Sequence, residues 1–267
     1  EPGGQLGPDD HLSRSPMDWK VFLASATGKY HLDQNAPCQD FAHHEVCCGV
    51  LVGAVCDGAG SAPEGRFGAE FLARQVTRRL AAAVELGGLP VEPEESWHEF
   101  ITPVIAAVRA ELEAHATAQG LTLRDHAATL VGCIAGADGG CFFHIGDGFA
   151  VHQPEAGDTT LSRPENGEYA NETYFATDEG WQDHLRVTPL PALPPGSTLG
   201  LMSDGSSAFA IDRGRTGFYR PFIDPVLNYL RAASEPLGNE ALHNLLASEK
   251  TFEITSDDKT LLLAIKG

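Results

Sequence analysis

The chain has 267 residues, a length that fits one large domain or two small ones, and 42% of them are hydrophobic, enough for a globular core. Its 37 acidic and 18 basic residues give a formal charge of -19 and a pI of about 4.8. This excess of negative charge argues against nucleic acid or an anionic membrane as the main partner, because both require basic patches. Solubility alone is a sufficient reason for such a charge.

The cysteines and the N-terminal residues indicate the compartment and the domain boundaries. The six cysteines form no C-x-x-C pair, and several lie in apolar runs where a free thiol acts as a small hydrophobic side chain. This usage favours a reduced, cytoplasmic protein over a zinc site or a disulfide framework. No apolar run reaches membrane-spanning length. Residues 1–16 are polar with Gly and Pro, so we interpret them as a tail before a single domain over residues 17–267.

The first elements that the pattern predicts are strands and a long helix. Residues 19–26 are a strand candidate, and residues 46–56 are apolar enough for a buried strand or a close strand pair. Ser61 and Glu64 have the spacing of a capping box, so we expect a helix to begin there. Apolar residues then recur at helical spacing until Gly87, where the helix is expected to end.

A second helix follows, and two starts for it remain open. Ser96 and Glu99 form another capping-box pair, whereas Pro103 suits the first helical position. Beyond this helix the pattern changes to short apolar segments typical of strands, at residues 127–135, 141–145, 150–153 and 159–162.

The remaining elements indicate the fold class. Residues 163–183 are polar and irregular, which predicts a surface loop beside a site. Strands are expected at 198–202 and 260–265, with helices at 225–233 and 239–248 between them. Because strands and helices do not alternate regularly, an α+β fold of antiparallel sheets with helices packed outside fits better than a doubly wound parallel sheet.

Four carboxylates share one position in this pattern, at the edge of an apolar strand beside a glycine or another acid. They are Asp40, Asp57, Asp204 and Asp257, and Gly146-Asp147-Gly148 adds a similar turn. Each Asp-Gly pair alone is an ordinary turn signal. Gathered in one place, however, carboxylates repel each other unless a positive charge lies between them, and a divalent metal ion is the simplest such charge.

In their order along the chain these segments resemble the motifs of the metal-dependent serine/threonine protein phosphatases, the type 2C or PPM family, in its bacterial form. The matching segments are Gln39-Asp40, Val55-Cys56-Asp57-Gly58-Ala59-Gly60, Ala128-Thr129-Leu130, His144-Ile145-Gly146-Asp147-Gly148, Leu201-Met202-Ser203-Asp204-Gly205 and Asp257-Asp258-Lys259-Thr260. The resemblance extends from about residue 20 to the C-terminus. It implies a four-layer α-β-β-α sandwich with two central antiparallel sheets and metal ions in a cleft at one end.

The resemblance also implies roles for individual residues. Asp57 is expected to bridge two metal ions, the carbonyl of Gly58 to bind the first ion, and Asp204 and Asp257 to bind the second. Asp40 is expected to hold metal-bound waters, so Asp40 and Asp57 are the catalytic candidates. Such oxygen ligands select Mg²⁺ or Mn²⁺ over zinc. The implied reaction is attack of a metal-bridging water on phosphoserine or phosphothreonine.

The chain departs from the family pattern at three positions. Asn35 stands where many members have an arginine that grips phosphate, Gln39 where many have glutamate, and Ala59 where several have a histidine proposed as general acid. Phosphate would then need another cation. The candidates are Lys29, His31 and Arg66, although a solvated loop or helix charge is the more common role for each such residue.

Two further features stay open on the sequence. A third metal ion is possible, with Asp125 or Asp258 as its ligand. Residues 171–175 lie where the family has a flap over the cleft, so they are either a substrate-reading loop or a surface loop without a role.

Two other functions compete with the phosphatase. The missing arginine and histidine motivate a catalytically weak phosphoprotein-binding module with the same fold. A serine hydrolase at Ser203 is disfavoured, because the nucleophile elbow needs glycine where this chain has Leu201. The expected partner is a phosphorylated protein, either a serine/threonine kinase or its target, and the expected state is a monomer.

Overall fold

The computed structural model describes residues 19–90, 94–165 and 173–267, so the predicted tail at 1–16 lies outside the described residues. Strands of the described ranges form two antiparallel sheets of five strands each. The first sheet has the order β1 (Trp19–Ala26), β10 (Lys259–Lys266), β9 (Thr198–Met202), β6 (Phe149–Gln153) and β7 (Thr160–Ser162). The second has the order β2 (Phe41–Cys47), β3 (Val50–Cys56), β4 (Leu130–Gly136), β5 (Gly139–Ile145) and β8 (Arg186–Leu190).

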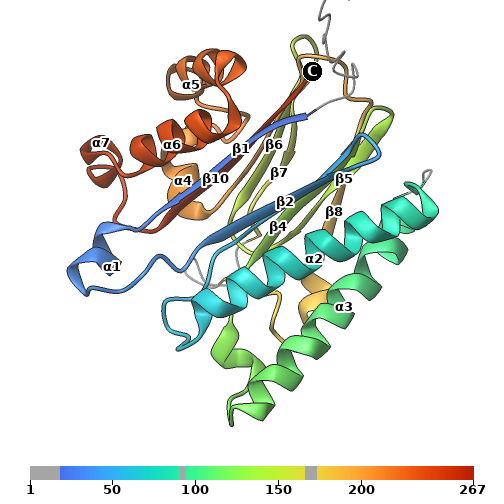
Figure 1. Ribbon diagram of the computed structural model, residues 1–267, viewed down its shortest axis with the longest axis vertical. Helices are drawn as coiled ribbons and strands as arrows, with labels where there is room; N and C mark the ends of the chain where they lie inside the picture. Colours follow the sequence, from blue (N-terminus) through green and yellow to red (C-terminus); the bar gives the residue numbers. More distant parts are fainter. Residues whose placement is uncertain (1–18, 91–93, 166–172) are drawn as a thin grey trace, which may run out of the picture.

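Helices cover the outer face of each sheet (Figure 1). Over the second sheet lie α2 (Gly65–Gly87) and α3 (Glu94–Ala118). Over the first sheet lie α4 (Asp204–Ala210), α5 (Arg220–Ala232) and α6 (Glu235–Leu246). The short elements are α1 (Lys29–Asp33), α7 (Glu249–Phe252) and the 3₁₀ turns η1 (Leu123–His126) and η2 (Trp181–His184).

Three apolar layers hold these parts together. One lies between the sheets, where Val55 and Val131 of the second sheet pack with Leu201 and Leu262 of the first. The other two lie between each sheet and its helices. Full burial of a Val, Leu or Phe side chain stabilises the fold by about 1.5–3 kcal/mol, so these layers supply the main driving force. The α-β-β-α sandwich expected from the sequence is confirmed.

The start expected for the first long helix is wrong, and so are the two alternative starts for the second. The first long helix, α2, begins at Gly65, after the Ser61 to Glu64 segment, and has no side-chain cap. The backbone N–H of Glu64 instead donates to the carbonyl of Asp125 at 2.8 Å. The described part of α3 begins at Glu94, so Ser96 and Pro103 both lie inside it.

The close strand pair, one of the two alternatives for residues 46–56, is confirmed as a hairpin in which β2 pairs with β3 around Cys48 and Gly49. Other boundaries differ from expectation. The strand expected from residue 127 begins at Leu130, and the helix expected from residue 225 begins at Arg220, with a proline in its first turn. Strand β8 and the short helix α1 were not expected. Within the described ranges, no helix combines the length and apolar character that a membrane crossing requires.

Candidate active site

Asp57 lies at the end of β3, a strand in which all seven residues are buried. Its backbone N–H donates to the Thr129 hydroxyl at 3.0 Å, and the Thr129 N–H donates to the Asp57 carbonyl at 2.9 Å. A Cβ added at Gly58 would lie 2.4 Å from the backbone of Gly65, so only glycine fits there. The carboxylate therefore projects from a rigid turn.

Three other carboxylates approach Asp57 from separate elements. Asp204 is the first residue of α4, directly after β9, while Asp147 lies in the turn between β5 and β6 and Asp257 precedes β10. Oxygen atoms of Asp57, Asp147 and Asp204 all lie within 4.8 Å of one another. We call these three residues the acidic group. They come together because the ends of strands from both sheets meet at one end of the sandwich.

The electrostatics of this group favour a cation. Burial and the nearby carboxylates of Asp40, Asp204, Asp147 and Asp257 raise the pKa of Asp57 well above its ordinary value. Burial, with Asp147 and Asp257, also raises the pKa of Asp204 to about 6. A divalent ion would relieve this repulsion between like charges.

Unpartnered oxygens show that the residues fit a metal ion. One carboxylate oxygen each of Asp40, Asp147 and Asp204 is buried and has no hydrogen-bond partner within the described part of the chain. A buried polar atom without a partner is costly, and these are hard oxygen donors of the kind that Mg²⁺ and Mn²⁺ prefer. The group therefore offers what a divalent ion requires.

The acidic group opens into a cleft of about 290 Å³. Its lining residues come from α1 and from the loops at the strand ends: Tyr30, His31, Asp57, Gly58, Ala59, Gly60, Thr129, Asp147, Thr173, Phe175, Ser256 and Asp257. Thr173 donates its hydroxyl to Asp147 Oδ2 at 2.6 Å. Of the flap expected at 171–175, Thr173 and Phe175 reach the cleft, whereas residues 171 and 172 lie outside the described residues.

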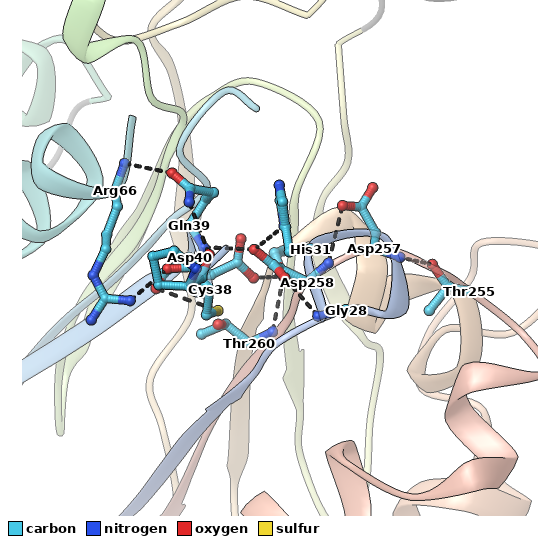
Figure 2. Close-up of polar contacts among 12 residues, drawn as sticks. Gly28, His31, Cys38, Gln39, Asp40, Arg66, Thr255, Asp257, Asp258 and Thr260 are labelled. Atoms are coloured by element: carbon cyan, nitrogen blue, oxygen red, sulfur yellow. Dashed lines mark hydrogen bonds and ion pairs between the residues drawn. The ribbon is translucent and has the colours of Figure 1, made fainter. Parts of the chain in front are cut away.

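Asp258 has a different environment from its neighbour Asp257 (Figure 2). Its carboxylate is buried and accepts the backbone N–H groups of Gly28 and Gln39, each at 2.6 Å. It also bonds Nδ1 of His31 at 2.9 Å. Both oxygens of Asp258 are thus used by the 28–39 loop, and this residue anchors the wall of the cleft rather than joining the acidic group.

Asp40 lies deeper, behind the acidic group. Its Oδ2 accepts the hydroxyl of Ser203 at 2.6 Å, and the Ser203 oxygen in turn accepts the N–H of Thr260 at 3.0 Å. Burial raises the pKa of Asp40 to about 7, although the Ser203 hydrogen bond opposes the rise. Ser203 is therefore committed to Asp40, which leaves it no part in a serine hydrolase.

Asp125, expected as a possible ligand of a third ion, lies outside the acidic group. Its Oδ2 accepts the N–H and the hydroxyl of Thr122 at 2.8 and 2.7 Å, which caps η1. Both bonds engage the carboxylate locally. Asp147 is the additional acid that the structure brings to the site, although sequence reasoning noted it only as part of a turn.

Comparisons with known proteins agree with this architecture. The family model described as Protein phosphatase 2C matches residues 27–247. The chain is also 31% identical to serine/threonine-protein phosphatase 3 of Escherichia coli K12 over 257 residues, which covers 93% of this chain and 99% of that protein.

The chain belongs to the protein phosphatase 2C family. It is a phosphatase of a family that depends on metal ions. Two solved structures agree in fold. The Streptococcus agalactiae (S. agalactiae) serine/threonine phosphatase matches with a TM-score of 0.61 at 14% identity, over 94% of this chain and 100% of that one. PppA of Pseudomonas aeruginosa matches with a TM-score of 0.60 at 18% identity, over 93% and 98%.

The structure separates the three phosphate-binding candidates of this phosphatase. Lys29 pairs with Asp33 at 2.8 Å on an exposed surface. Arg66 donates Nη1 to the carbonyl of Cys38 at 2.8 Å, and neither cation lines the cleft. His31 does line it, with Asp258 holding its Nδ1.

Asn35 has a φ of 53°, in the left-handed region that asparagine tolerates better than most residues. The residue closes the turn after α1, where its N–H donates to the carbonyl of Leu32 at 3.1 Å.

Proposed function

We propose that this phosphatase hydrolyses phosphoserine and phosphothreonine in a protein substrate with the help of Mg²⁺ or Mn²⁺. The observation that carries the proposal is the acidic group, three carboxylates within 4.8 Å of one another at the mouth of the cleft. Membership of a metal-dependent phosphatase family supports the same conclusion.

The ligands that we propose for two ions are Asp57, Asp204, Asp257 and the carbonyl of Gly58, which leaves Asp147 of the acidic group for a third ion. Bound divalent ions would supply an activated water and neutralise the phosphoryl oxygens. The chain itself would fix the geometry. Thr129 holds the backbone of Asp57, and Thr173 holds one oxygen of Asp147. The free, buried Oδ1 of Asp40 would accept a hydrogen bond from water at the site.

We assign the phosphate contact to His31. With Nδ1 bound to Asp258, its Nε2 is the nitrogen left for the cleft, and a Cβ added at Gly60 would lie 3.7 Å from it. In its imidazolium form His31 donates from both ring nitrogens, from Nδ1 to Asp258 and from Nε2 to a phosphoryl oxygen. Tyr30 and Phe175 form the apolar walls beside it.

The test is turnover of p-nitrophenyl phosphate and of a phosphothreonine peptide by the full chain, with Mn²⁺, with Mg²⁺ and with EDTA. We expect hydrolysis that needs the metal and that disappears in Asp57→Asn. Absence of turnover on both substrates in the presence of either metal would overturn the proposal. Phosphopeptide binding without turnover would instead support the phosphoprotein-binding module, which the family comparison does not favour.

We propose a serine/threonine kinase or its target as the physiological partner. The support is the family's activity on phosphoproteins and the acidic surface charge, which makes nucleic acid an unsuitable partner. The monomeric state stays a prediction.

A further inference from the structure

The layer between the two sheets is apolar over most of its area, but it becomes polar at the edge formed by β7 and β8. These two strands are the last in their sheets and contact each other (Figure 1). Along β8, Val187 packs under the helices and Leu190 packs between the sheets. Since alternate residues of a strand share a face, Arg186 and Thr188 face the other sheet together with Leu190.

The facing strand β7 is polar on the same side. Leu161 packs with the helices outside its sheet, which turns Thr160 and Ser162 towards the second sheet. The hydroxyl-bearing edge of β7 thus meets the edge of β8, which carries Arg186 and Thr188, across the open side of the sandwich. With Arg163 they line an open hollow of about 420 Å³.

Two buried histidines pair with this polar edge in the strand registers, although neither lines the hollow. His144 lies opposite Arg186 in the β5–β8 register, and His152 lies opposite Thr160 in the β6–β7 register. Both are almost fully buried, at 0% and 1% exposed. His144 Nδ1 is 2.9 Å from the hydroxyl of Ser162, while its Nε2 and both nitrogens of His152 have no hydrogen-bond partner among the described residues.

Arg186 is also incompletely satisfied. Its Nη1 donates to the carbonyl of Arg163, but Nε and Nη2 are buried without a hydrogen-bond partner among the described residues. Its Nε forms an ion pair with Glu165 at 3.6 Å. Among the described residues, no carboxylate lines the hollow itself. So many buried donors without acceptors are unusual, and each needs a partner.

We propose that this hollow binds a small phosphate-bearing anion between the edges of the two sheets, with Arg186 and the hydroxyls of Thr160, Ser162 and Thr188 as donors. A guanidinium repels metal ions, and its planar fork matches the oxygens of a phosphate. Burial and the charge of Arg186 hold the pKa of His144 well below its usual range, so its imidazole is neutral and carries one N–H. With that N–H on Nδ1, His144 donates to the Ser162 oxygen, which leaves the hydroxyl proton of Ser162 for the anion. The site lies apart from the acidic group and is not used in the proposed hydrolysis.

The experiment is calorimetric titration of the metal-free full chain with two probes, inorganic phosphate and glucose 6-phosphate. Binding of both probes shows that the phosphate group itself is recognised. Binding of only one shows whether the anion is free phosphate or a phosphate ester. In Arg186→Met we expect affinity to fall at least about tenfold, since hydrogen bonds to charged groups contribute roughly 1.5–3 kcal/mol each.

Matched controls separate this site from the catalytic cleft and from general charge. Arg78→Met removes an exposed arginine of α2 and is expected to keep wild-type affinity. His31→Gln changes the cleft, so any binding that it removes belongs to the cleft and the binding that it leaves belongs to the hollow. If Arg186→Met does not fold, the Thr160→Val and Thr188→Val double variant reports on the same site. The proposal is overturned if neither probe binds, if Arg186→Met and the double variant both bind as wild type, or if His31→Gln abolishes binding.

Discussion

Asp258 offers the sharpest test of how the cleft is held together. Its buried carboxylate accepts hydrogen bonds from Gly28, His31 and Gln39, at 2.6 to 2.9 Å. In Asp258→Asn one oxygen becomes an amide nitrogen, which cannot accept. Whichever way the amide turns, at least one N–H donor loses its acceptor, and it faces another donor.

The expected size follows from these contacts. Loss of one hydrogen bond to a charged acceptor costs about 1.5–3 kcal/mol. For a chain of this size each kcal/mol lowers the Tm by about 2–4 °C, so the variant is expected to melt roughly 3–12 °C lower. Because the loop that carries Tyr30 and His31 loses its anchor, we also expect a higher KM for a phosphothreonine peptide.

The assay is denaturant and thermal unfolding of the metal-free chain, followed by Mn²⁺ titration. Asp33→Asn is the matched control in the same loop, since its exposed ion pair with Lys29 is worth about 0.5 kcal/mol or less. Unfolding of Asp258→Asn at the wild-type midpoint would refute the reasoning. Wild-type stability combined with weaker Mn²⁺ binding would show instead that Asp258 is a metal ligand.

Three further predictions concern the acidic group. We expect that Mn²⁺-dependent hydrolysis is lost in Asp57→Asn and also in Asp204→Asn, and that Mn²⁺ no longer raises the Tm of either variant. Circular dichroism is expected to show that both variants keep the fold. Wild-type rates of hydrolysis in either variant would contradict the assignment. Asp147→Asn is expected to weaken Mn²⁺ binding in calorimetry, whereas Asp125→Asn is expected to leave it unchanged, because Asp125 only caps η1. Weaker Mn²⁺ binding in Asp125→Asn and unchanged binding in Asp147→Asn would instead support Asp125, the residue suggested by the sequence, as the metal ligand. Burial raises the pKa of Asp40 to about 7 and of Asp204 to about 6, so between pH about 4 and 7 the folded, metal-free chain binds more protons than the unfolded one. The free energy of unfolding of the metal-free chain is therefore expected to fall as the pH rises through that range, and to depend less on pH when Mn²⁺ is present. A free energy of unfolding that rises with pH in the metal-free chain would be incompatible with these shifts.

Local patterns were reliable where a single element sets them. The apolar runs before Asp57 and Asp204 required buried strands, and the glycines after them required tight turns, so both carboxylates could be placed at strand ends. Antiparallel sheets with helices outside followed from the order of elements, because irregular alternation excludes a doubly wound parallel sheet.

Sequence signals for helix starts and strands failed where a distant segment of the chain supplies the hydrogen-bond partner or the neighbouring strand. Ser61 does not cap α2 because Asp125 and Ala127 accept the N–H groups of Glu64 and Ala59 from across the fold. Strand β8 was not expected because it contains a proline, which an edge strand tolerates, and only the sheet order shows that β8 is an edge.

The sequence by itself determined the strand-end positions of Asp57, Asp204 and Asp257, since apolar periodicity and turn residues are properties of neighbouring positions. The family, and the sandwich that it implies, followed from the order of the motifs along the chain. Only the tertiary structure decided which carboxylates share a site. In the structure Asp147 lies in the acidic group, Asp258 accepts hydrogen bonds from residues 28–39, and Asp125 caps η1. Strand ends and loops far apart in the chain meet only when both sheets have packed, and no local pattern encodes that meeting.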